Sequence, residues 1–428
     1  MSVTTDRGVY YDPYDREILA DPYPVFRRLR DEAPVYFNEK FDFYGLSRFQ
    51  DVEDALKDKL VFSSKKGVIL DMIQADFEMP PGTLIHDEPP IHTIHRGLLS
   101  RVFTPKAMNA IEPQVRAFCA QRLDELMERD TFDWVGEFAR FVPMRVFGML
   151  LGIGEEDQER VLAHVEAGME LETADREYDD DFLLDGFYDE FVDFRATNPG
   201  DDLITRLIST EFDDENGEHR TLTRTESLTY LAVIAGAGNH TTNRLIGWTA
   251  KILADNPDAR AEVAADRSLI PNTIEETLRY EPSSTQIGRY LTEDVELHGQ
   301  TMEAGHAVLL LAASANRDER QFDDPDTFDV HRQIGQPHLR LRRALLPGHV
   351  ARTAGRKGRA RGVAQAIHGV GGRPRQRPAR ELAGRARLCL AADPAAMTSQ
   401  GEQVQGFVPP RSTSCPDTGA SPSASPPG

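Results

Sequence analysis

The stretch Ala237-Gly238-Asn239-His240-Thr241-Thr242 lies near the middle of the longest apolar helical pattern in this 428-residue chain. The pattern predicts a helix from about Thr223 to Ala254, because Thr223 and Glu226 form a capping-box pair and Asn256-Pro257 ends the run. A helix this long and this apolar is expected to cross the core of the protein.

Two glycines interrupt the interior of this predicted helix. Gly236 and Gly238 each cost about 1 kcal/mol relative to alanine there, which suggests that another group approaches the backbone or that the helix widens. Thr241 and Thr242 can return hydrogen bonds to carbonyls one turn back and leave a hydroxyl facing a cavity. A glycine-lined crossing of two helices explains the pattern equally well, so the stretch alone leaves the choice open.

The sequence on either side of this helix is mostly helical as well. Apolar and charged positions alternate at spacings of three to four over 107–128 and 134–152, which predicts amphipathic helices. A shorter helix is expected at about 271–280, between Pro271 and Pro282. Short strands are expected at four places: 33–37, 43–46, 286–290 and 308–311. The expected fold class is mostly α with small β-sheets, in one domain over residues 1–338.

Composition limits the protein's partners. Residues 1–338 carry 34 basic against 66 acidic side chains, which argues against non-specific binding to nucleic acid or anionic membranes. No signal peptide and no apolar run of 18 residues is present, so a cytoplasmic protein without a membrane partner is expected. Cys119, Cys389 and Cys415 show no paired spacing, which excludes a disulfide scaffold and a cysteine-rich zinc site.

Two further motifs carry potential chemistry. Glu276 and Arg279 share a helix face, although such a pair is usually a surface salt bridge. Three histidines between residues 86 and 95 suggest a metal site, but their spacing fits no standard zinc pattern. His92 and Arg96, four residues apart on a helix, would instead present a dicationic face to an anionic ligand such as a carboxylate.

Taken in order, these segments resemble the cytochrome P-450 family of haem-thiolate monooxygenases in its soluble bacterial form, over roughly residues 10–338. Each motif is weak alone, and the ordered set is specific. The matching motifs are Asp87-x-Pro89-x-x-His92-x-x-x-Arg96 with Phe103-Thr104-Pro105, Ala237-Gly238-x-x-Thr241-Thr242, Glu276-x-x-Arg279 with Arg332 as a third partner, Asn316-Arg317-Asp318, and Phe322-x-x-Pro325.

The resemblance implies a haem b cofactor and roles for individual residues. Thr241 would help activate O2 and deliver protons, and Ala237 and Gly238 would line the haem. His240 stands where the family usually has an acidic residue, and its imidazole either relays protons or turns away from the cavity. Buried haem propionates need cationic partners, and the residues that would supply them are His92, Arg96, Arg289 and His338. A buried structural network would comprise Glu276, Arg279 and Arg332.

The implied reaction is the hydroxylation of an apolar small-molecule substrate. One oxygen atom would come from O2, and the electrons would come from a ferredoxin and its ferredoxin reductase. These partners follow from the resemblance, and the sequence itself does not identify the substrate.

The composition changes abruptly after His338. Residues 339–428 hold 15 basic and 4 acidic side chains, with Phe407 as their only aromatic residue. Without large apolar side chains such a tail is not expected to build a core, and it reads as basic, aromatic-poor and disordered. An Arg-rich segment that binds nucleic acid is a less favoured interpretation.

The break also removes the expected iron ligand. The family places its cysteine in Phe-Gly-x-Gly-x-His-x-Cys-x-Gly, soon after the position of His338, and the thiolate promotes O–O cleavage. Residues 339–348 contain no cysteine. The chain as written is therefore either a monooxygenase sequence with a defect or a haem-poor, ligand-binding remnant without catalysis.

A shift of the reading frame by one nucleotide explains the missing ligand. When the second base of each codon becomes the first base of a new codon, residues 339–348 can encode Phe-Gly-Tyr-Gly-Ala-His-Tyr-Cys-Leu-Gly. The cysteine then falls at the codon of Leu346. In the same frame residues 349–360 can encode Thr-Ser-Leu-Ala-Arg-Leu-Glu-Gly-Arg-Val-Ala-Leu, a plausible helix. We therefore predict that the chain is read out of frame from about residue 338.

Overall fold

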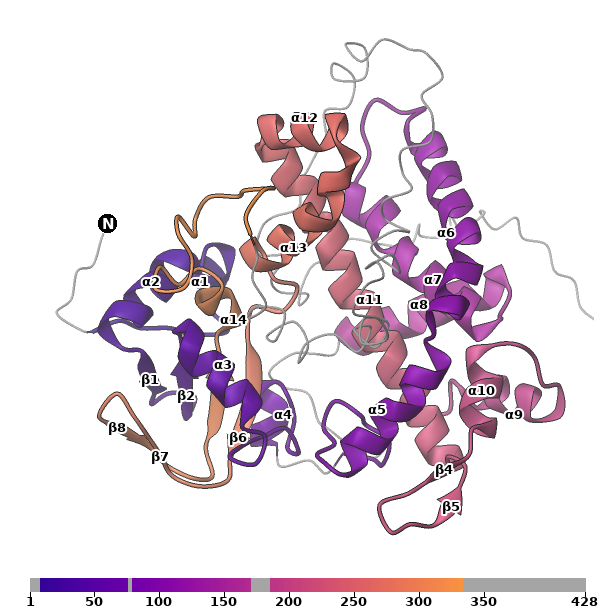
Figure 1. Cartoon of the computed structure of the whole chain (residues 1–428), viewed down its shortest axis with the longest axis horizontal. Coiled ribbons are helices and arrows are strands. Elements are labelled where there is room, and N and C mark those ends of the chain that lie inside the picture. The colour runs from indigo at the N-terminus through magenta and orange to yellow at the C-terminus, as the bar shows by residue number, and fades with distance from the viewer. Residues whose placement is uncertain (1–7, 76–78, 171–184, 334–428) are drawn as a thin grey trace, which may run out of the picture.

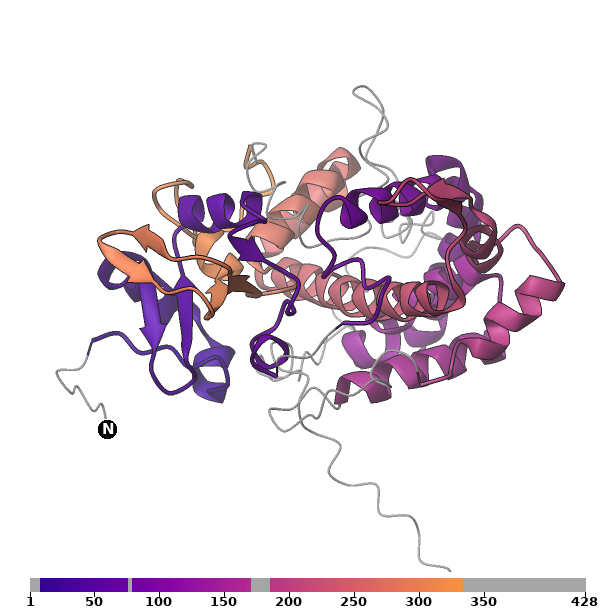
Figure 2. The same ribbon diagram turned by 90° about the horizontal axis from the view of Figure 1, so that it is seen from below.

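The computed structural model describes residues 8–75, 79–170 and 185–333, and the long central helix organises them. Helix α11 (Arg224–Asp255) begins at the predicted capping box: the Thr223 hydroxyl accepts from the Glu226 amide at 3.2 Å, and the Glu226 carboxylate accepts from the Thr223 amide at 2.7 Å. It ends at Asn256. Figure 2 shows α11 running through the helical part of the molecule.

The remaining helices of this part gather around α11 (Figure 1). The predicted helix at 107–128 is confirmed as α6 (Pro105–Leu126), and the one at 271–280 as α13 (Ile270–Tyr280). The others are α5 (Ile91–Val102), α7 (Phe141–Leu151), α8 (Glu155–Glu170), α9 (Asp189–Thr197), α10 (Leu203–Ser209), α12 (Pro257–Ala265) and the 3₁₀ turn η2 (Arg267–Leu269).

The helix expected at 134–152 differs in its first turn. Residues Val135–Ala139 form a π-helical turn, η1, in which the Arg140 amide donates to the Val135 carbonyl at 3.1 Å. The Asp133 carboxylate accepts from the Val135 and Gly136 amides, at 2.9 and 3.0 Å. Widened turns of this kind are rare and depend on such local contacts, which a hydrophobic period does not reveal.

A five-stranded sheet with short helices forms the other side of the molecule (Figure 1). Its strands, in spatial order, are β1 (Val35–Asn38), β2 (Phe43–Leu46), β9 (Ala307–Leu310), β6 (Ile287–Leu291) and β3 (Phe62–Ser63). The strand predictions are therefore confirmed within a residue or two. Only β2 and β9 pair in parallel, and both are buried along their length, as apolar parallel strands usually are.

Short helices and two hairpins complete the described chain. The helices are α1 (Arg16–Ala20), α2 (Tyr23–Glu32), α3 (Phe49–Lys57), α4 (Leu70–Gln74) and α14 (Ala312–Ala315). The hairpins pair β4 (Phe212–Asp213) with β5 (His219–Arg220), and β7 (Val295–Leu297) with β8 (Gln300–Met302). The fold is mostly α with small sheets, as expected. Within the described residues, no helix has both the length and the apolarity to cross a membrane.

Candidate functional site

The middle of α11 has one open face. Gly238 is exposed, whereas its neighbours Asn239 and His240 are buried. A Cβ atom built at Gly236 or Gly238 would meet nothing within 4 Å. A flat group can therefore approach the backbone at Gly238, whereas Gly236, two residues earlier, lies on nearly the opposite side of the helix.

Thr241 is held at the edge of this face. Its hydroxyl donates to the Ala237 carbonyl at 2.8 Å, the return bond that the adjacent threonines suggested. The Thr241 carbonyl in turn accepts from the Ser283 hydroxyl at 2.8 Å, and Arg244 donates to the Ser283 carbonyl at 3.0 Å. These contacts place the segment that leads into β6 beside α11.

His240 lies on the buried side of α11. It is 9% exposed and shares that side with Asn239 and Asn243. Thr241, by contrast, is only partly buried. The two neighbours expected to handle protons thus differ in their access to the open face.

Cationic side chains from three elements influence one another. His92 and Arg96 lie on α5, as the sequence predicted, Arg289 lies on β6, and Lys59 follows α3. Burial lowers the pKa of Arg289 to about 10. Burial lowers the pKa of Lys59 as well, with Arg96 and Arg289 adding to the effect. Positive charge is therefore concentrated here, which favours an anionic ligand.

Arg289 has no carboxylate partner among the residues that the structure describes. Its guanidinium donates to the Gly288 carbonyl at 2.7 Å, and within the described part of the chain it forms no ion pair with a carboxylate. The guanidinium is partly buried, and a desolvated cation without an anion is unfavourable, so this residue identifies a place where a carboxylate of a ligand would bind.

The expected dicationic face on α5 needs a correction. Burial, followed by the charges of Lys59 and Arg96, lowers the pKa of His92 to about 4, so its imidazole is neutral at neutral pH. The helix offers one fixed charge and one neutral donor. Sequence reasoning also missed Lys59, because no periodicity or motif connects it with α5 or β6.

The three residues of the expected network meet in the structure. Glu276 and Arg279 are 0% and 1% exposed, and two hydrogen bonds of 2.8 and 2.7 Å join them. Arg332 Nε lies 3.1 Å from Glu276 Oε1. Arg279 also donates to the carbonyls of Asn316 and Pro325, at 3.0 and 2.7 Å. The network therefore fixes the irregular segment before residue 333.

Cys119 does not have the properties of a metal-binding thiolate. It is buried in α6 among apolar side chains, and burial raises the pKa of its thiol to about 11. No trio of His, Cys, Asp or Glu residues suited to a metal ion occurs within 8–75, 79–170 and 185–333. Four positions of interest lie outside the described residues: His338, Leu346, Cys389 and Cys415.

The described residues fit the organic part of haem. Haem is flat and carries two carboxylates, and the described residues offer an open helix face and a partly buried cation that no carboxylate among them pairs with. A thiolate ligand for iron is not found among the described residues, since burial of Cys119 strongly disfavours its thiolate form.

Comparisons with known proteins concern the chain as a whole. The family model "Cytochrome P450" matches residues 180–334. The putative cytochrome P450 123 of Mycobacterium tuberculosis (strain ATCC 25618 / H37Rv) is 35% identical over 337 residues, which are 77% of this chain and 82% of the relative. The structure of cytochrome P450 CYP109Q5 from Chondromyces apiculatus is 33% identical with a TM-score of 0.65, covering 80% of this chain and 90% of that chain. The structure of CYP109E1 from Bacillus megaterium in complex with corticosterone is 26% identical with a TM-score of 0.63, covering 78% and 89%.

Proposed function

This chain belongs to the cytochrome P450 family, and from that membership we propose which of its residues serve the family's reaction. The family's members are monooxygenases that contain haem b. They activate O2 and insert one oxygen atom into an organic substrate. The proposals below concern the parts that this chain itself contributes to that oxidoreductase chemistry.

The haem propionates would be held by Arg289, Arg96 and His92. Lys59 would add a further positive charge. His338 is expected to contribute as well, and it lies outside the described residues. The observation that carries this proposal is the partly buried guanidinium of Arg289, whose pKa is lowered by burial and which forms no ion pair with a carboxylate of the described chain. A bound carboxylate would also raise the pKa of His92 from about 4, because an adjacent anion favours the imidazolium. Haem, when bound, would supply the iron at which O2 reacts.

Thr241 would hold and pass a proton at its Oγ1 atom. The hydroxyl proton is directed to the Ala237 carbonyl, so the oxygen can accept a hydrogen bond from a group on the open face. Ala237 and Gly238 would lie against the haem, because that part of α11 has room for a flat group. His240 lies on the buried side of α11, so it would take part in proton transfer only from that side.

The substrate would be an apolar organic molecule. The solved relative from Bacillus megaterium is in complex with corticosterone, which supports a substrate of low polarity without identifying it. Electrons would come from a ferredoxin and a ferredoxin reductase, and the reaction would take place in the cytoplasm. A complementation assay with several ferredoxin pairs tests the redox partner.

The missing thiolate would be the result of a frame slip. The family-model match ends at residue 334, close to the predicted break at about residue 338. The relative from Mycobacterium tuberculosis is matched over 82% of its length. Sequencing the coding DNA tests this proposal: a single-base insertion or deletion near codon 337 is expected, and an intact frame that excludes the cysteine motif would refute it.

A carbon monoxide difference spectrum of the reduced, purified chain tests whether it binds haem through a thiolate. The chain as printed is expected to lack the Soret band of thiolate-ligated haem, whereas the protein with the restored frame is expected to show it. A thiolate-type band from the printed chain would mean that another cysteine binds the iron. Absence of the band in both proteins would favour the haem-poor remnant.

A further inference from the structure

His86 is buried, and its imidazole has no hydrogen-bond partner among the residues that the structure describes. The residue is 4% exposed, and neither Nδ1 nor Nε2 donates or accepts a hydrogen bond there. A neutral imidazole carries one N–H donor and one acceptor, and leaving such groups unsatisfied in the interior is costly. His86 is therefore a buried donor for which the described chain supplies no acceptor.

The loop that carries His86 is held by its own backbone contacts. The His86 amide donates to the Thr83 carbonyl at 2.8 Å, and the Thr83 hydroxyl donates to the Pro80 carbonyl at 2.6 Å. Gly82 has a φ of +92°, and a Cβ atom built on it would lie 3.0 Å from the Glu226 backbone of α11. The loop is thus packed closely against the first turn of α11, and only glycine permits this approach.

Two charged residues act on His86. Burial lowers its pKa to about 4, Asp87 opposes this effect, and Arg289 on β6 lowers the pKa further. The Asp87 carboxylate contacts another histidine, since its Oδ2 atom lies 3.1 Å from Nδ1 of His95. His86 is therefore neutral at neutral pH, and it is influenced by a guanidinium that no carboxylate of the described residues neutralises.

An anionic acceptor suits both of these groups. A neutral imidazole can donate its N–H to a carboxylate oxygen, and a guanidinium binds a carboxylate through charge-assisted hydrogen bonds. An anion bound at Arg289 would also offset the unfavourable effect of this cation on His86. An uncharged acceptor would satisfy the imidazole and leave the guanidinium without a counter-charge. The chemistry of the two side chains therefore selects a carboxylate.

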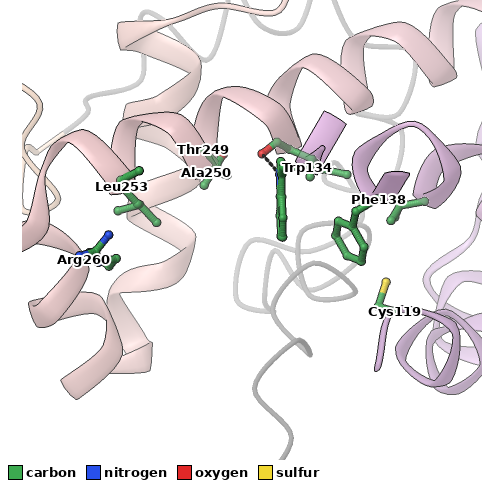
Figure 3. A pocket seen from close by; sticks show the side chains of 10 residues that line it. Cys119, Trp134, Phe138, Thr249, Ala250, Leu253 and Arg260 are labelled. Carbon is green, nitrogen blue, oxygen red and sulfur yellow. Dashed lines mark hydrogen bonds between the residues drawn. The ribbon is translucent and has the colours of Figure 1, made fainter. Parts of the chain in front are cut away.

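The apolar pocket shown in Figure 3 lacks such a group. Its volume is about 310 Å³, and it is lined by side chains from α6, η1, α7, α11 and α12. Trp134 Nε1 donates to the Ile246 carbonyl at 3.3 Å, and the Thr249 hydroxyl donates to the Leu245 carbonyl at 2.7 Å. None of the lining residues named for it has a buried nitrogen or oxygen atom without a partner. The unsatisfied donor distinguishes the loop of His86 from this pocket.

We propose that His86 is a further hydrogen-bond donor to the carboxylate that Arg289 binds. The proposal rests on the proposed function, in which this carboxylate belongs to haem. His86 precedes Asp87, the first residue of the motif that predicted His92 and Arg96, so the motif gave it no role. The imidazole would add a neutral, directional contact to the positive charge of Arg289, and a hydrogen bond to a charged group is stronger than one between neutral groups.

Paired titrations with hemin and hemin dimethyl ester test the proposal on the full printed chain. The ester has the same ring and no free carboxylate. We expect His86→Met to weaken hemin binding about tenfold, as the loss of a hydrogen bond to a charged group implies, and to leave binding of the ester within about twofold. His86→Gln keeps an N–H donor and should retain most of the affinity for hemin.

His95→Met is the matched control. His95 is a buried histidine of the same region, and its ring already has a carboxylate partner in Asp87. Its replacement should change the affinities for hemin and for the ester by the same factor. Equal losses for the two molecules in His86→Met would overturn the proposal, because a purely structural role affects both alike.

Two further measurements separate the alternatives. A titration with dodecanoate tests a carboxylate of the substrate: weaker dodecanoate binding in His86→Met with unchanged hemin binding would overturn the assignment to haem. The Arg289→Met variant tests the proposed function itself. If this variant loses the preference for hemin over the ester and His86→Met keeps it, only the role of His86 is refuted. If Arg289→Met also keeps the preference, the proposed propionate site is refuted as well.

Discussion

Arg332 Nε lies 3.1 Å from Glu276 Oε1, and this contact joins the last described segment of the chain to α13. The same carboxylate oxygen accepts from Arg279 at 2.7 Å and from the Asp329 amide at 3.1 Å. One buried carboxylate therefore organises two guanidinium groups and a turn. All of these residues precede the change in composition after His338.

Replacing Glu276 should destabilise the protein strongly. Glu276→Gln leaves the guanidinium of Arg279 buried without its anion, and breaking such a pair costs about 3–5 kcal/mol. Urea unfolding measured by circular dichroism should show a clearly lower midpoint. The control is Glu32→Gln, which breaks an exposed pair with Arg28 and should leave the midpoint unchanged. Similar midpoints for the two variants would contradict the structural role of Glu276.

Replacing Arg289 should have opposite effects on the empty protein and on haem uptake. Arg289→Met removes a partly buried cation whose pKa is lowered by burial and that has no carboxylate partner in the described chain, so the urea midpoint of the haem-free protein should rise. Hemin binding, followed by absorbance titration, should weaken at least tenfold. Arg30→Met is the control, because Arg30 is paired with Glu319 and its loss should lower the midpoint. Unchanged hemin affinity in Arg289→Met would remove this residue from the proposed site.

His86 should make the protein sensitive to acid. Burial lowers the pKa of His86 to about 4, and neither ring nitrogen has a hydrogen-bond partner in the described chain. The unfolded chain, with a pKa of about 6.5, therefore binds the proton more readily. Stability is present above about pH 6.5 and is lost as the pH falls toward 4.

The His86→Met variant should lose less stability on acidification. Between about pH 7 and pH 5 the wild-type protein should lose about 2 kcal/mol more than the variant, measured by urea unfolding at both pH values. His219 is the control, since it is exposed and Asp213 raises its pKa. Its stabilising effect is lost as the pH rises, so His219→Gln should not reduce the acid sensitivity. Equal losses in wild type and His86→Met would show that His86 is not the group responsible.

Thr241 should control how O2 is used in the protein with the restored frame. Thr241→Ala removes the hydroxyl that donates to the Ala237 carbonyl, so the side chain could no longer hold or pass a proton at the open face of α11. Oxygen consumption should continue while product falls and hydrogen peroxide rises, measured with an oxygen electrode and a peroxidase assay. Thr241→Ser keeps the hydroxyl and should stay near the wild-type ratio. A Thr241→Ala variant with normal coupling would exclude the proposed proton role.

Local signals in the sequence were sufficient for much of the fold. The capping box of Thr223 and Glu226 acts within a few residues, and so do the prolines that flank 271–280. Helices α11 and α13 begin at these local signals. The pair Glu276 and Arg279 was less certain, because its spacing is equally common on helix surfaces. Only the family pattern distinguished it before the structure showed both side chains buried.

Properties that depend on distant parts of the chain could not be predicted. Arg96 and Arg289 lower the pKa of Lys59 although the three residues are far apart in the sequence, and no spacing in the sequence encodes that proximity. The neutral state of His92 has the same origin, since its pKa reflects burial and charges from other elements. The motif predicted that His92 faces an anionic ligand, but it could not predict the protonation state of the imidazole.

The parallel pairing of β2 with β9 has a consequence for biosynthesis. Phe43 pairs with Ala307, so the first strands cannot complete their sheet until the ribosome has delivered most of the chain. A protein cut short before residue 307 would leave β2 with an unpaired edge, the kind of surface that promotes aggregation. A chain altered only after residue 338 has already closed that edge. An error at this point leaves this strand pair intact, so aggregation through the edge of β2 would not reveal it.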